Sequence, residues 1–188
     1  MNEGHLTYLA SPAWRDEVTN RILPWVLEGR TLGVELLEIG PGPGLTTDVL
    51  RGLVGRITAV ELDEQLAAEL TRRLVGTNVE VLHADATDLP LPDDRFSSAA
   101  CLTMLHHVPT TDLQDQLLRE ACRVLRPGGI LVGTDSLDVP MVRAGHADDI
   151  FVPVDPETFP DRLRAAGFGA VEIGLDENRL RFAATKPD

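Results

Sequence analysis

The sequence predicts an α/β fold in which helices cover both faces of a mostly parallel, seven-stranded sheet. The first observation is that short apolar runs alternate with amphipathic segments between residues 34 and 134, as parallel strands joined by helices do. The second is that the C-terminal end carries two strand-like runs separated only by residues 176–178, which is typical of a hairpin. An antiparallel hairpin strand is therefore expected to close an otherwise parallel sheet.

The first helix and the strands follow from the spacing of apolar residues. Over residues 11–28, Trp14, Val18 and Ile22 recur every four residues, as they would on one face of a helix. The segments predicted as strands are short, apolar and bounded by turn-forming or acidic residues. They are residues 34–39, 56–61, 79–83, 96–102, 130–134, 170–175 and 179–185.

The remaining helices lie between these strands. They run from a glycine-rich loop to about residue 52 and over residues 64–74, 113–125 and 156–167. The helix over 113–125 is expected to stop at residues 126–129, Arg-Pro-Gly-Gly, because proline and glycine both disfavour its continuation. Residues 138–154 show no clear periodicity and are expected to be irregular.

Residues 36–45 carry the most informative motif. An apolar strand contains an acidic residue, Glu38, near its end and runs into three alternating glycines, Gly40, Gly42 and Gly44. Glycines let the backbone turn sharply and let a ligand come close where a Cβ would collide. A carboxylate beside such a loop favours a cationic ligand over a pyrophosphate. The loop is therefore expected to bind a small, positively charged molecule.

Acidic side chains also follow the second and third strands, and the carboxyl ends of parallel strands line one crevice. Glu61 follows Gly40 at close to the roughly 20-residue offset at which an acidic side chain binds ribose hydroxyls. Asp85 can accept a hydrogen bond from an exocyclic amine such as that of adenine. The inferred ligand is an adenosine with a positive, phosphate-free tail.

In order and spacing, these motifs resemble those of the class I S-adenosylmethionine-dependent methyltransferases, of the small, type 11-like kind. The matching motifs are Glu38-Ile39-Gly40-Pro41-Gly42-Pro43-Gly44, Glu61-Leu62-Asp63, Asp85-Ala86 and Leu125-Arg126-Pro127-Gly128-Gly129. The resemblance covers residues 36–134. It implies a Rossmann-like fold with a terminal hairpin, S-adenosyl-L-methionine as the cofactor, and methyl transfer by in-line displacement.

The resemblance also implies which residues contact the cofactor. Glu38 would hold its amino-acid end, Glu61 would bind the ribose, and Leu62 would pack on the adenine. The glycines would border the methionine moiety, and the pair that follows the third strand would contact the adenine edge. The full set of expected cofactor-binding residues is Glu38, Gly40, Gly42, Gly44, Glu61, Leu62, Asp85, Ala86 and Thr103.

Two other functions fit parts of the pattern. A nicotinamide-dependent oxidoreductase also has a glycine loop and a ribose-binding acid, but Glu38, the Gly-x-Gly-x-Gly spacing and the closing hairpin disfavour it. A non-catalytic cofactor-binding module, such as a regulatory subunit, would carry the same binding motifs, because binding and turnover use different residues. An Asp at a strand end, such as Asp85, is also often only a turn residue.

Residues after the fourth and fifth strands are expected to face the methyl acceptor. His106 is the leading candidate for a general base, ahead of its neighbour His107, because histidine titrates near neutral pH. Asp135, Arg143 and His146 are expected to line the acceptor pocket. No metal ion is predicted, since the spacing of these residues supplies no local pair of ligands.

The sequence favours one methyltransferase domain over residues 1–188 that acts on a small molecule. Residues 1–30 would form an N-terminal lid or helix, 34–135 the cofactor-binding core, and 136–188 an acceptor-side loop, helix and terminal hairpin. The formal net charge of −13 opposes nucleic acid binding. No signal peptide and no apolar run of the roughly 18 residues that span a membrane are visible, so a cytoplasmic location without membrane contact is expected.

Overall fold

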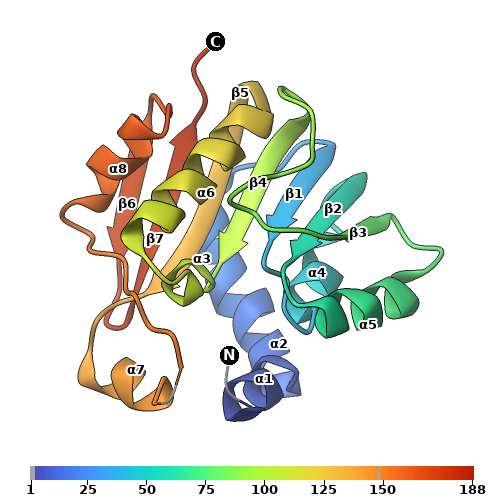
Figure 1. Ribbon diagram of the computed structural model, residues 1–188, viewed down its shortest axis with the longest axis vertical. Coiled ribbons are helices and arrows are strands. Elements are labelled where there is room, and N and C mark those ends of the chain that lie inside the picture. The colour runs from blue at the N-terminus through green and yellow to red at the C-terminus, as the bar shows by residue number, and fades with distance from the viewer. Residues whose placement is uncertain (1–2, 148) are drawn as a thin grey trace.

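The computed structural model describes residues 3–147 and 149–188, the side chains of Glu3 and His5 excepted, so the first two residues of the predicted segment 1–30 lie outside it. One sheet has the strand order β3-β2-β1-β4-β5-β7-β6 (Figure 1). Its strands are β1 (Glu35–Ile39), β2 (Arg56–Glu61), β3 (Val79–His83), β4 (Phe96–Leu102), β5 (Leu125–Ser136), β6 (Val171–Leu175) and β7 (Arg179–Thr185). Strand β7 is antiparallel to β5 and β6, and the other pairs are parallel, which confirms the predicted fold class.

Helices cover both faces of this sheet. Leu36 and Leu37 of β1 belong to different apolar clusters, because successive side chains of a strand point to opposite faces. Helices α6 and α8 pack on the face of Leu37, and α2, α3 and α4 pack on the face of Leu36 (Figure 1). The helical elements are α1 (Glu3–Leu9), α2 (Pro12–Glu17), the π-turn η1 (Val18–Ile22), α3 (Leu23–Leu27), α4 (Leu45–Leu50), α5 (Glu64–Leu74), the 3-10 turn η2 (Leu105–His107), α6 (Thr111–Val124), α7 (Pro140–Gly145) and α8 (Phe159–Ala165).

Several predicted elements differ from the structure by one to three residues at their ends, and the larger differences lie in β5 and in residues 138–154. Strand β5 begins at Leu125 rather than at residue 130, because Leu125 pairs with Phe96 before an irregularity in the register. The Pro-Gly-Gly run therefore ends α6 but lies inside the strand. Within residues 138–154, which were expected to be irregular, α7 forms from Pro140 to Gly145, with a proline in its first turn.

The predicted N-terminal helix is present but is not uniform. In its middle, the N–H group of Leu23 donates to the carbonyl of Val18, five residues back. Pro24 follows directly and has no N–H with which to continue an ordinary helical ladder, which accounts for a widened turn at this point. Helix α1, which precedes it, was not predicted.

The carboxyl ends of the central strands are tied together at one edge of the sheet. Gly40 N–H donates to the carbonyl of Val60 at 2.9 Å, and Thr103 N–H donates to the carbonyl of Thr134 at 2.7 Å. This edge therefore holds the segments that follow β1, β2, β4 and β5 in fixed positions. Among the described helices, none combines the length and the apolarity that crossing a bilayer requires.

Candidate functional site

The glycine loop between β1 and α4 has a left-handed backbone at each of its three alternating glycines. The φ angles of Gly40, Gly42 and Gly44 are 66°, 55° and 82°. A Cβ built on Gly40 would lie 3.0 Å from Cε of Met104, whereas one on Gly42 would have no atom within 4 Å. The loop thus packs against the segment after β4 at one glycine and leaves open space at the next, as the predicted ligand site requires.

Glu61, at the end of β2, holds this loop in place. Its Oε2 atom accepts a hydrogen bond from the N–H of Gly42 at 2.9 Å, and Oε1 accepts one from the N–H of Asp63 at 3.0 Å. The side chain is buried. Because each carboxylate oxygen can accept two hydrogen bonds, each oxygen of Glu61 can accept one more, as the predicted ribose contact requires.

Glu38 lies under the loop and is buried, with 3% of its surface exposed. Burial raises the pKa of this carboxyl to about 7, the Thr47 hydroxyl opposes the rise, and the nearby acids Asp48 and Glu61 add to it. Its Oε2 atom has no hydrogen-bond partner among the described residues. A buried, unpartnered carboxylate is costly unless a cation or a donor reaches it, so the position is suited to an ammonium group.

The residues expected to contact adenine lie at the outer end of the same edge. Leu62 is 66% exposed, which is high for a leucine and leaves its side chain available to a planar ring. Asp85 is exposed, and its Oδ1 atom accepts bonds from the backbone and the hydroxyl of Thr87, both at 2.8 Å. Asp85 therefore serves as a turn residue. Its Oδ2 atom takes part in neither of these two bonds. Ala86 is half-buried against the core.

A cavity lies between the glycine loop, the end of β4 and the N-terminal helices. Its walls include Trp14 of α2 together with Thr103 and Met104. Trp14 is also 4% exposed and part of the core, so the N-terminal helix both packs on the sheet and closes the cavity. Thr103 has a φ of 55°, an uncommon conformation for a residue with a side chain, and such strain is found at ligand-contacting positions.

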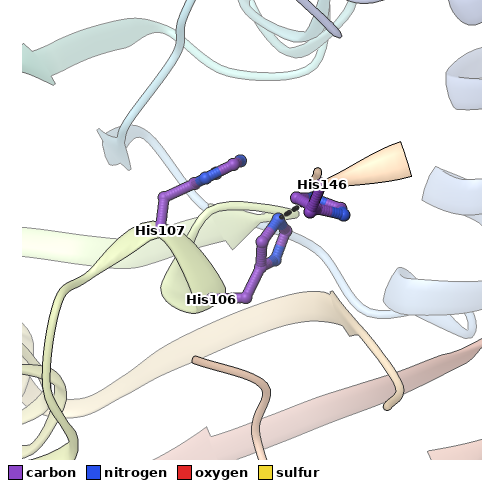
Figure 2. Close-up of side chains that lie close together, drawn as sticks. All are labelled: His106, His107 and His146. Atoms are coloured by element: carbon purple, nitrogen blue, oxygen red, sulfur yellow. Dashed lines mark hydrogen bonds between the residues drawn. The ribbon is translucent and has the colours of Figure 1, made fainter. Parts of the chain in front are cut away.

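The acceptor side contains a buried pair made by residues far apart in the sequence. The Nδ1 atom of His106 lies 2.5 Å from Oδ1 of Asp135, and the two side chains are 1% and 0% exposed. The Nε2 atom of His106 lies 3.1 Å from Nε2 of His146, at the C-terminal end of α7 (Figure 2). The structure thus brings together three of the four residues predicted on this side.

The fourth predicted residue, Arg143, is turned away from this group. Its guanidinium forms a two-bonded ion pair with Asp138, at 2.5 and 2.6 Å, and its side chain is 61% exposed. Its guanidinium carbon lies 5.9 Å from the ring centroid of Phe151, and its backbone carbonyl accepts the N–H of His146 at 3.1 Å. Arg143 is placed at the outer rim.

Two further residues complete the group. They are His107, which the sequence offered as the second candidate for a base, and Phe151, which the sequence did not predict. His107 has its ring centroid 4.1 Å from that of His106 and 5.4 Å from that of His146. Phe151 stacks on His146 with centroids 4.5 Å apart. The adjacent histidines were a usable signal for His107, whereas Phe151 lies in a stretch without periodicity. We refer to His106, His107 and His146 as the histidine cluster.

Comparison with known proteins places this geometry in context. Residues 37–133 match the model of a family described as "Methyltransferase domain". A demethylmenaquinone methyltransferase of Clavibacter sepedonicus is 31% identical over 85% of this chain and 73% of its own length. A 27-O-demethylrifamycin SV methyltransferase of Amycolatopsis mediterranei is 32% identical over 83% of this chain and 55% of its own length, so the chain spans about half of that relative.

Solved structures share the fold at low identity. The N-methyltransferase NodS of Bradyrhizobium japonicum, in complex with S-adenosylhomocysteine, is 18% identical with a TM-score of 0.75 over 100% of this chain and 94% of its own. The [4+2]-cyclase SpnF is 22% identical with a TM-score of 0.71 over 89% and 80% of the two chains.

Proposed function

Because this chain belongs to the class I S-adenosylmethionine-dependent methyltransferases, we propose that it transfers the methyl group to a small molecule at the histidine cluster. The observation that carries the proposal is the burial of the His106–Asp135 pair. His106 and Asp135 are almost fully buried beside the segment that packs on the glycine loop, so a compact acceptor suits the site better than a polymer. The net charge of −13 also disfavours nucleic acid, although some relatives are named as ribosomal RNA methyltransferases.

The residues of this chain fit S-adenosylmethionine, which supplies a methyl group on a positively charged sulfur. Glu38 offers a buried, unpartnered oxygen for the ammonium end, and the open space beside Gly42 admits the ligand. Glu61 keeps acceptor positions for the ribose, while Leu62 and the Asp85-Ala86 pair would border the adenine. The acid-lined edge attracts a cation and repels a pyrophosphate.

We assign His106 a catalytic role on the acceptor side. The carboxylate of Asp135 accepts the Nδ1–H of His106, which leaves Nε2 as the basic nitrogen. In this form His106 promotes loss of the acceptor's proton before or during attack on the methyl carbon. Asp135 is then a positioning residue, and Phe151 helps to exclude water from the site.

The two relatives described above support a small acceptor. Their names give demethylmenaquinone and 27-O-demethylrifamycin SV as substrates, and both are small molecules. For this chain we therefore propose a low-molecular-weight acceptor.

Binding of S-adenosylmethionine by calorimetry tests the cofactor side. We expect Glu61→Ala to weaken binding by about tenfold to hundredfold, since a hydrogen bond to a charged group is worth about 1.5–3 kcal/mol. Glu69→Ala removes an exposed acid from α5 and should leave the affinity unchanged. Equal binding by wild type and Glu61→Ala would contradict the assignment.

A screen for S-adenosylhomocysteine release, with a panel of small phenols, enols, amines and thiols, tests the acceptor side. We expect at least one class to stimulate release in the wild type. Stimulation by RNA or by protein alone would refute the proposal of a small acceptor.

A further inference from the structure

The histidine cluster gathers three imidazoles from two separate segments. His106 and His107 lie on η2, and His146 lies at the end of α7 (Figure 2). One ring nitrogen from each of the three lies within 4.8 Å of the others. Neutral imidazole is the most common protein ligand for borderline metal ions such as Zn²⁺.

The hydrogen bonds of the rings leave the Nε2 atoms of two histidines facing each other. Nδ1 of His146 lies 2.8 Å from the carbonyl of Val142, which can only accept, so this nitrogen carries the proton. Nδ1 of His106 lies 2.5 Å from the carboxylate of Asp135, which makes it a donor in the same way. In these neutral tautomers both Nε2 atoms carry lone pairs, and they lie only 3.1 Å apart.

Two lone pairs at this distance repel each other unless a positive charge lies between them. A single extra proton would satisfy His106 and His146, but it would give no reason for a third imidazole in the same place. A metal ion would use all three. In a tetrahedral site with Zn–N bonds of about 2.0–2.1 Å, the nitrogens lie about 3.4 Å apart. The Nε2 atoms of His106 and His146 are already close to this distance. The ring of His107 would need to move by about 1–2 Å to reach it.

The surroundings also suit a cation held by nitrogen ligands. Asp135 binds the far side of His106 and would orient it, as carboxylates do behind metal-bound histidines. The Nδ1 atom of His107 lies 3.3 Å from the carbonyl of Ile150 and 3.9 Å from the carboxylate of Asp149. Two acids, Asp135 and Asp149, therefore face the cluster. The nearby guanidinium of Arg143 is paired with Asp138.

We propose that His106, His107 and His146 bind one divalent transition-metal ion, with Asp135 as the outer residue that fixes the first ligand. Three protein ligands leave one tetrahedral position for water or for the acceptor. Binding of the acceptor in that position depends on the proposed function. An acceptor hydroxyl in that position loses its proton to solvent more readily, its oxygen then bonds to the methyl carbon, and the carbon–sulfur bond breaks to release S-adenosylhomocysteine. His106 would then promote loss of the acceptor's proton by holding the ion, rather than by taking the proton itself.

Titration of the tag-free, EDTA-treated chain with ZnCl₂ by calorimetry tests the site without any acceptor. We expect one equivalent to bind, and we expect His106→Ala and His146→Ala each to weaken binding at least tenfold. Asp135→Asn should weaken it by about tenfold to hundredfold, because outer residues contribute that much to metal affinity. His83→Ala is the matched control, since His83 is exposed and its ring contacts the carbonyl of Leu62, away from the histidine cluster.

Replacement of Zn²⁺ by Co²⁺ adds a geometric test, because four-coordinate Co²⁺ absorbs visible light much more strongly than the hydrated ion. The strong absorption should appear in the wild type and in His83→Ala and be lost in His146→Ala, whose side chain is only half-buried, so this variant should keep the fold. If the wild type binds no equivalent of Zn²⁺, or if the cluster variants bind it as the wild type does, the site is refuted and an extra proton accounts for the geometry. Binding of S-adenosylmethionine, measured separately, would be untouched by that failure.

Discussion

The cofactor side and the acceptor side of the site are built in different ways. On the cofactor side, Glu38, the glycine loop and Glu61 come from two adjacent strands and their first turns. On the acceptor side, the histidine cluster and Asp135 come from η2, β5 and α7, which are far apart in the sequence. The cofactor side depends on backbone conformation, whereas the acceptor side depends on side chains that meet only in the folded chain.

The two sides also differ in how their carboxylates are satisfied. Glu38 is buried next to other acids, and its pKa is raised. Asp135 is buried as well. Its Oδ1 atom bonds to a histidine, while its Oδ2 atom, like Oε2 of Glu38, has no hydrogen-bond partner among the described residues. On the cofactor side, a cationic ligand can supply the positive charge that Glu38 lacks. On the acceptor side, Asp135 already has a partner in His106. The difference suggests that binding of the cofactor and action on the acceptor can be separated by substitution.

The largest expected effect tests that separation. His106→Ala should lower the turnover number by about a hundredfold or more, because proton-transfer catalysis contributes about 10²–10⁴ in rate. Its dissociation constant for S-adenosylmethionine should stay within about twofold of the wild type. Steady-state kinetics with the acceptor found by the screen, alongside calorimetry, measures both quantities. Turnover equal to that of His83→Ala would remove His106 from the mechanism.

The pH dependence of Glu38 gives the next effect. Because its pKa is raised in the folded chain, the folded state binds this proton more tightly than the unfolded state. The associated stability is present below about pH 4.5 and is lost as the pH rises through about 7, by up to roughly 3 kcal/mol. We expect the free energy of unfolding, measured in urea, to fall less between about pH 5 and pH 8 in Glu38→Gln than in the wild type.

The same substitution sharpens the electrostatic comparison. In the wild type, affinity for S-adenosylmethionine should increase as the pH rises towards 8, since the ionised carboxylate attracts the cationic ligand. In Glu38→Gln the affinity should be lower and less dependent on pH, while Glu69→Gln should follow the wild type. A pH profile that is the same in all three proteins would show that Glu38 does not contact the charged end.

The contrast between the two sides also explains what the sequence could predict. The sequence predicted a sharp glycine turn after the first strand and an acid at the end of the second, because both follow from local spacing. The structure adds that Gly40, Gly42 and Gly44 are left-handed and that Glu61 bonds to this loop. Strands β2, β3 and β4 and helix α5 match their predicted bounds, since their apolar patterns are regular. The comparisons with named methyltransferases then favour methyl transfer over an oxidoreductase or a non-catalytic module.

Tertiary contacts account for what local spacing did not provide. The sequence predicted no metal ion because His106 and His146 are 40 positions apart, yet their Nε2 atoms lie 3.1 Å from each other. The distance depends on α7, which lies in a stretch without clear periodicity. The contact between Gly40 and Met104 was also out of reach, because it joins two loops rather than two residues of one motif.

That contact joins the two sides of the site, and it gives the smallest predicted effect. Gly40→Ala should cost about 1–2 kcal/mol of stability, because φ is 66° and a side chain disfavours the left-handed region. The new Cβ would also lie 3.0–3.2 Å from three atoms of Met104, which must move. Met104 immediately precedes η2, so the shift should lower turnover as well as cofactor affinity by several-fold.

Gly29→Ala is the matched control for this coupling. Gly29 has a φ of 81°, yet a Cβ there would have no atom within 4 Å. Both variants should lose free energy of unfolding in urea because of the left-handed backbone, and Gly40→Ala should lose more because Met104 must move. Gly40→Ala alone should change turnover and affinity. If Gly29→Ala lowers turnover equally, the effect comes from general destabilisation and the two sides are not coupled through Met104. If Gly40→Ala changes affinity but not turnover, the glycine loop and the histidine cluster act independently, since the displacement of Met104 then does not reach His106.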